Sequence, residues 1–135
     1  MISLELARAL RDSGLVWRPE RGDNFRIDRI EADAEVYTLS DMTVEAHTFS
    51  SGTVLGFNGT TEWALDSVAL DDALWLPRED QLRSLLGPAF VSLERVDPDH
   101  RVVALIDGAR LEFEATDAAD AYARALLALL DAVTA

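Results

Sequence analysis

The stretch AFVSLERVDPDHRVVALIDGARLEFEA, residues 89–115, carries the clearest signal of the fold. Three short apolar runs, at 89–95, 101–106 and 109–115, are joined by a DPDH turn and by Asp107-Gly108. Asp-Gly is typical of a two-residue type I′ turn, which connects neighbouring antiparallel strands. The stretch therefore predicts a three-stranded antiparallel meander.

Helical periodicity is present both before and after this meander. Residues 3–12 carry apolar side chains on one helical face, with Ser3 as the expected cap and Gly14 as the end. A central helix is predicted to start at Pro77 and to close at Gly87-Pro88, and a last helix is predicted from Asp117 to Val133, capped by Thr116 or Asp117. The predicted core face of the central helix consists of Leu82, Leu85 and Leu86.

The strands before the central helix are shorter and less regular. We expect strands near 25–27 and 35–39, and a β-hairpin formed by 42–49 and 53–57. Because strands are grouped rather than alternating with helices, the sequence predicts an α+β fold, with a mainly antiparallel sheet of about six strands and N-terminal, central and C-terminal helices. No linker interrupts the chain, so we expect a single domain over 1–135.

Composition and charge exclude several classes of chemistry. The chain has no cysteine, and all of its 12 basic residues are arginine, so cysteine-ligated zinc and lysine-dependent phosphate loops are excluded. The formal net charge of −13 disfavours nucleic acid as a partner. No apolar run is long enough for a membrane span, and the start MISLELARAL lacks a basic n-region. We therefore expect a cytoplasmic protein without cofactor, ATP or membrane partner.

The segment GFNGTTEWALDS, residues 56–67, has the composition of a phosphate-binding loop but not its spacing. Neither GxxxxGK[ST] nor GxGxxG is present. A structural interpretation explains the same residues, because Asn58-Gly59 suits a tight turn and Trp63 and Leu65 suit a core. We interpret this segment as a turn.

Carboxylates and a histidine around this segment offer an alternative function. Glu45 and His47 project from one side of the predicted hairpin strand, and Glu62 and Asp66 would share a face if their segment is helical. Such a set could hold a ligand or metal ion, or perform acid–base chemistry. A chain with 25 acidic residues also forms such pairs by chance, and exposed carboxylates commonly serve solubility.

Two features are candidates for contacts with other proteins. Trp75 precedes the central helix, where an exposed aromatic side chain and the positive helix end could accept an acidic peptide, although tryptophan is more often largely buried. In the last helix, a strip of small residues lies beside a bulky apolar face. The strip packs on the N-terminal helix, or consists of exposed alanines that favour helix formation, or, with Leu127, forms a homodimer. Its residues are Ala121, Ala125, Ala128 and Ala132.

Four segments resemble a known family over nearly the whole chain. They are SLELARALRDSGLVWRPERGD, SDMTVEAHTFSSGTVLGFNGTTEWALDSV, LWLPREDQL and DAADAYARALLALL. These segments resemble a family of short uncharacterised actinobacterial proteins, some of which carry the label pilus assembly protein CpaE. CpaE proper is similar to MinD-class ATPases, which need a lysine that this chain lacks. The resemblance thus implies no ATPase activity and no catalytic residue.

Together these observations favour a non-catalytic protein-interaction or regulatory module whose partner the sequence does not name. The alternative is a small enzyme or ligand-binding protein with its site near 42–66. A deep pocket lined by the carboxylates and histidine would favour the enzyme. A flat apolar patch would favour the interaction module.

Overall fold

The structure is a computed structural model that describes residues 1–28, 36–39, 45–49, 52–56, 67–69 and 72–134. For 45–49, 52–56 and 67–69 it describes the backbone alone. The chain divides into two compact units. Unit 1 comprises Met1–Val16 and Pro77–Ala135, and unit 2 comprises Trp17–Leu76. The expectation that 1–135 forms one domain stays a prediction.

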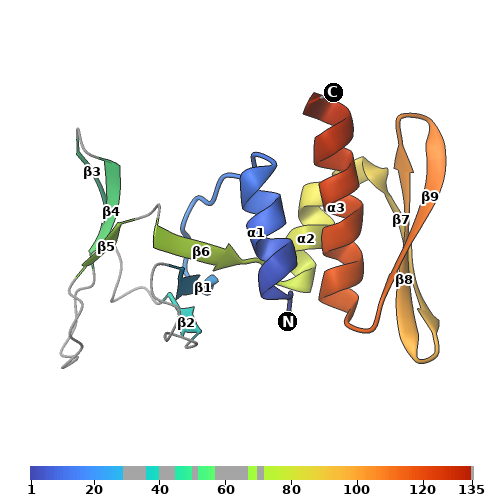
Figure 1. Cartoon of the computed structure of the whole chain (residues 1–135), viewed down its shortest axis with the longest axis horizontal. Coiled ribbons are helices and arrows are strands. Elements are labelled where there is room, and N and C mark those ends of the chain that lie inside the picture. The colour runs from blue at the N-terminus through green and yellow to red at the C-terminus, as the bar shows by residue number, and fades with distance from the viewer. Residues whose placement is uncertain (29–35, 40–44, 50–51, 57–66, 70–71, 135) are drawn as a thin grey trace. The chain divides into compact units, whose positions relative to one another are not determined.

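Unit 1 is a layer of helices on one face of an antiparallel sheet (Figure 1). The sheet has the order β7-β8-β9. The three strands are β7 (Phe90–Val96), β8 (Asp99–Ile106) and β9 (Ala109–Ala115). The helices are α1 (Leu4–Asp12), α2 (Glu79–Leu86) and α3 (Ala118–Thr134), and a 3-10 turn, η2 (Gly87–Ala89), joins α2 to β7. The predicted meander is therefore confirmed.

The central strand β8 contributes the core of this unit. Val102, Ala104 and Ile106 alternate along β8 and are buried, with exposed fractions of 0%, 0% and 5%. The strand packs against α3, which also contacts α1, α2 and β9. At the β8–β9 turn, Asp107 and Gly108 have φ values of 53° and 78°. Positive φ at both central residues is the geometry that a two-residue type I′ turn requires.

The caps predicted for α1 and α3 are confirmed. Ser3 Oγ accepts a hydrogen bond from Leu6 N at 3.3 Å, and Asp117 Oδ1 accepts one from Ala119 N at 2.8 Å. Ser3 N also donates to Asp120 Oδ1 at 2.6 Å, which joins the first turns of the two helices. Burial raises the pKa of Asp117, but hydrogen bonds from the Met1 amino group and from Ala119 N–H outweigh it, so the net shift is downward.

Two details of the central helix differ from the expectation. The helix begins at Glu79 rather than at Pro77, because Arg78 is still extended and acts as the N-cap, its backbone N–H donating to Gln81 Oε1 at 3.0 Å. Leu82 and Leu86 are buried as predicted, but Leu85 is 40% exposed, so its place in the core face was wrong. Leu85 lies three residues after Leu82 and directly before Leu86, at the border of the apolar face of this eight-residue helix. Only the part of that face with Leu82 and Leu86 is buried.

Unit 2 contains short antiparallel strands. One sheet has the order β2-β1-β6, with β1 at Asn24–Ile27, β2 at Tyr37–Thr38 and β6 at Ala73–Leu76. A second has the order β3-β4-β5, with β3 at Glu45–Phe49, β4 at Gly52–Gly56 and β5 at Ser67–Ala69. The predicted hairpin of 42–49 with 53–57 is confirmed by the pairing of β3 with β4. Strands β5 and β6 were not expected.

The α+β class, the three helices and the antiparallel pairing are confirmed. Within the described residues the strands are divided among separate three-stranded sheets. The predicted turn at Asn58-Gly59 and the expected burial of Trp63 and Leu65 lie outside the described residues. None of the described helices has the length and apolarity that a membrane span requires.

Replacing Gly87 with alanine should lower the free energy of unfolding by about 1–3 kcal/mol. Gly87 ends α2 at φ 56° and ψ −131°, a region that residues with a Cβ rarely adopt. An added Cβ would meet no other atom within 4 Å, so the cost would come from the backbone alone. Urea denaturation measures it, with Ser84→Ala on exposed α2 surface as a control expected to change stability by less than about 0.5 kcal/mol. Equal stability of the two variants would contradict the assignment.

Candidate interaction surface

The predicted carboxylate–histidine site falls largely outside the described residues. The backbone of Glu45 and His47 lies in β3, in register with Gly56 and Val54 of β4. Their side chains, and Glu62 and Asp66 entirely, are not among the residues whose side chains the structure describes. The site near 42–66 therefore stays a prediction. Among the side chains that are described, no group of three or more His, Asp and Glu is arranged to hold a metal ion.

Trp75 is part of an aromatic cluster in unit 2, not an exposed docking residue. It lies in β6 opposite Phe25 of β1, and packs with Tyr37 against the buried side chains of this unit. The Phe25 ring stacks on Tyr37 with ring centroids 5.5 Å apart, and it meets the Trp17 ring in a tilted contact at 5.4 Å. Trp75 is half-buried, which fits the burial usual for tryptophan better than the possibility of an exposed docking residue, because β-strand pairing places its ring on the same face as Phe25.

Asp23 organises the polar edge of this cluster, a role that the sequence did not indicate. Its side chain is only 2% exposed. The Oδ2 atom accepts hydrogen bonds from Trp17 Nε1 at 2.9 Å and from Glu20 N at 3.0 Å. The backbone of Asp23 meanwhile accepts from Leu39 N at 2.9 Å, next to the β1–β2 pairing. One carboxylate thus fixes the turn, the Trp17 ring and the start of β1.

The alanine strip of α3 is mostly used inside unit 1. Ala121 and Ala125 are completely buried, so they cannot contact a second copy, and their assignment as interaction residues was wrong. Leu127 and Ala128 are half-buried, whereas Ala132 is exposed. Small side chains allow close packing of α3 on its neighbours α1 and α2. Packing on the N-terminal helix, α1, is one of the alternatives considered for this strip. The homodimer itself stays a prediction.

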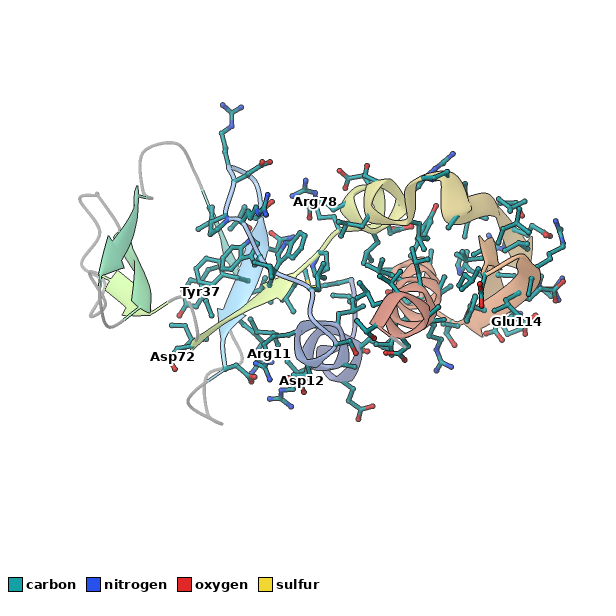
Figure 2. The ribbon with its side chains drawn as sticks, turned by 90° about the horizontal axis from the view of Figure 1, so that it is seen from above. Arg11, Asp12, Tyr37, Asp72, Arg78 and Glu114 are labelled. Atoms are coloured by element: carbon teal, nitrogen blue, oxygen red, sulfur yellow. The ribbon has the colours of Figure 1, made fainter. Side chains whose placement is uncertain are left out.

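The β7-β8-β9 sheet has one face without helices. Directly paired residues of antiparallel strands share a face, and the helix side is fixed by Phe90, whose ring lies 5.8 Å from that of Tyr122 in α3. The alternate residues point the other way, and Figure 2 shows Glu114 at this outer side, away from α3. We call this the open face. It comprises Ser92, Glu94, Val96, Asp99, Arg101, Val103, Leu105, Arg110, Glu112 and Glu114.

Charged side chains on the open face surround an apolar centre. Val103 has no exposed surface, which indicates that its neighbours on this face cover it, and Leu105 beside it is 49% exposed. Arg101 contacts Glu114 at 2.7 Å and Glu112 at 3.6 Å. The hydrogen bond with Glu114 raises the pKa of Arg101, and the charges of Glu112 and Glu94 add to it. Such exposed ion pairs contribute little stability, so they mainly hold side chains in place.

The remaining histidine, His100, is occupied by a structural contact. Its Nδ1 atom lies 3.0 Å from the carbonyl oxygen of Thr116, at the passage from β9 to α3. Thr116 Oγ1 donates to Asp99 Oδ1 at 3.3 Å. These contacts connect the end of β9 to the start of β8. His100 therefore supports the sheet rather than a catalytic arrangement with the open face.

Comparison with known proteins adds no relative: no family model, no curated protein and no solved structure matches this chain. The resemblance to short actinobacterial proteins consequently stays an expectation. The open face was not predicted either, although its charge alternation is present in the sequence LEFEA of 111–115. That alternation marks a solvent-facing strand side, and the pairing of three strands is what assembles it into a surface.

Asp23→Ala should lower the free energy of unfolding by roughly 1–3 kcal/mol, because it leaves the buried indole N–H of Trp17 and the part-buried N–H of Glu20 without their acceptor. Asp23→Asn is the matched control. Both donors bond the same oxygen, Oδ2, so the amide oxygen of asparagine at that position would accept both hydrogen bonds without carrying a charge. The free energy of unfolding should then fall by only about 1 kcal/mol. Chemical denaturation followed by circular dichroism compares the variants. Equal losses for the two would show that these hydrogen bonds are not the cause.

Proposed function

We propose that this chain is a non-catalytic protein-interaction module that acts in the cytoplasm, and that the open face of the β7-β8-β9 sheet is its contact surface. The observation that carries the proposal is the half-exposed side chain of Leu105 on a sheet face that otherwise presents mainly charged side chains, with Val103 buried beneath them. Protein interfaces typically have this anatomy, with an apolar centre and a polar rim.

The charge of the open face selects the kind of partner. Its acidic residues are Glu94, Asp99, Glu112 and Glu114, whereas its basic residues are Arg101 and Arg110. Arg101 pairs with Glu112 and Glu114, and the four carboxylates still outnumber the two guanidinium groups on this face. Together with the formal net charge of −13, this favours a partner surface rich in arginine or lysine. Opposite charge would also accelerate association at low ionic strength.

The ion pairs on this face favour recognition over catalysis. The Arg101 guanidinium is held by two glutamates, Glu112 and Glu114, in side chains that are roughly half-exposed, with fractions of 54% and 45%. Exposed carboxylates in this setting can contact cationic groups of a partner. The surface is therefore suited to reversible contacts.

Leu105→Arg should abolish capture of the partner, because it places a positive charge at the apolar centre and repels a basic surface. The matched control is Val133→Arg, since Val133 is also exposed, at 74%, but lies at the end of α3. Tagged wild-type and variant proteins would be incubated with lysate of the source organism. The partner is a protein that the wild type and Val133→Arg both retain and that Leu105→Arg retains at least about tenfold less. This protein would then be purified and titrated at two salt concentrations.

Circular dichroism should show both variants to be folded. Affinity of the purified pair should fall as salt rises, because the proposed contact is largely electrostatic at its rim. Equal capture by Leu105→Arg and Val133→Arg, or no specific capture by the wild type, would refute the open face as the contact surface.

A further inference from the structure

The outer edge of β9 is exposed along most of its length. Of the described strands only β8 pairs with β9, and it does so through seven consecutive positions without irregularity. Residues Ala109–Glu112 and Glu114 are exposed, and Leu111 retains 39% of its surface. An unpaired edge of this kind can hydrogen-bond to a strand from another chain.

The register identifies which backbone groups face outward. Ile106 and Ala109 flank the two-residue turn, so they form a hydrogen-bonded pair. Hydrogen-bonded and non-hydrogen-bonded pairs alternate in antiparallel sheets. The N–H and C=O groups of Arg110, Glu112 and Glu114 consequently point away from β8. The side chains of these residues belong to the open face.

The opposite edge of the sheet is less suitable. The pairing of β7 with β8 is irregular between Phe90 and Ser92, where the register shifts. A β-bulge twists and bends an edge and is a common device against strand addition. Strand β9 has no such irregularity and is protected only by its charges.

We propose that β9 accepts an extended segment of the partner as an added antiparallel strand, with basic side chains opposite Glu112 and Glu114 and an acidic one opposite Arg110. This rests on the proposed function of the sheet as a protein-contact surface. Directly opposite residues share a face, so charges would meet charges on the open face. Apolar partner residues would lie beside Leu111 and Phe113 on the helix side. From its N-terminus, the partner segment therefore reads basic, apolar, basic, apolar, acidic.

Charges on an edge strand also serve to prevent aggregation, and that role alone would give no preference among incoming strands. The proposal differs in requiring both a defined charge order and backbone pairing. The probe is the capped peptide Thr-Lys-Val-Lys-Val-Glu-Thr, added to the full chain labelled with ¹⁵N. Its charge-reversed counterpart is Thr-Glu-Val-Glu-Val-Lys-Thr. Binding should shift the amide signals of 109–115, and the reversed peptide should bind at least about tenfold more weakly.

Two N-methylated peptides separate strand pairing from charge attraction. Methylation of the lysine and glutamate nitrogens blocks the N–H groups that would face β9, whereas methylation of the valine nitrogens modifies groups that would face solvent. Only the first should abolish binding. The protein variant Glu112→Lys/Glu114→Lys should reverse the preference between the two charge patterns, and Glu5→Lys/Asp12→Lys on α1 should not.

Each outcome bears on the proposal. Absence of shifts in 109–115 at millimolar peptide, or equal binding of the two charge patterns, would overturn it. Equal binding of both methylated peptides would overturn strand pairing while leaving the open face as a charge-based surface. Loss of the partner with Leu105→Arg tests the proposed function separately, because Leu105 lies on β8 and not on the edge.

Discussion

The packing of strand β8 against helix α3 is the constraint on which unit 1 depends. The buried β8 residues Val102, Ala104 and Ile106 need an apolar cover, and α3 supplies it from the same unit. The helix is also bordered by α1 and α2. A helix with neighbours on several sides must be apolar over a wide arc, which explains why its first half consists largely of buried alanines around Tyr122 and Leu126.

This packing decides which surfaces remain for other molecules. Because α3 places Ala121 and Ala125 against elements of its own unit, this part of the small-residue strip is buried and cannot contact another molecule. The helices occupy a single face of the sheet, so its other face is left with charged side chains around Val103 and Leu105 (Figure 1). Antiparallel sheets tolerate such an arrangement, since one face can pack on a core while the other contacts water.

Unit 2 differs from unit 1 in that its described strands are short, so each of them buries little surface. Among the described residues of unit 2, large aromatic rings and a buried carboxylate contribute to its core. The Phe25 ring contacts the rings of Trp17 and Tyr37. Asp23 accepts the hydrogen bond of the Trp17 indole N–H. Among the described residues, the indole N–H of Trp75 is buried without a hydrogen-bond partner. Burial of that donor is a cost which the packing of this ring must offset.

The sequence by itself determined the elements whose signals are local. The Asp107-Gly108 turn, the Ser3 and Asp117 caps and the strand at 109–115 have signals among neighbouring residues alone, and each has the predicted structure. Strand β6 was missed because ALWL is apolar throughout and precedes a proline, so its periodicity does not distinguish a strand from the approach to a helix.

Only the tertiary structure decided burial and grouping. The sequence pattern of α3 is equally consistent with an alanine strip that is covered or free, and its neighbours settle that Ala125 is covered. The role of Asp23 was not predicted, since nothing local reveals an indole six positions away as its donor. Likewise Glu112, Glu114 and Arg101 are separate charges in the chain. They become one surface because strand pairing brings residues that are distant in sequence onto the same face of a sheet.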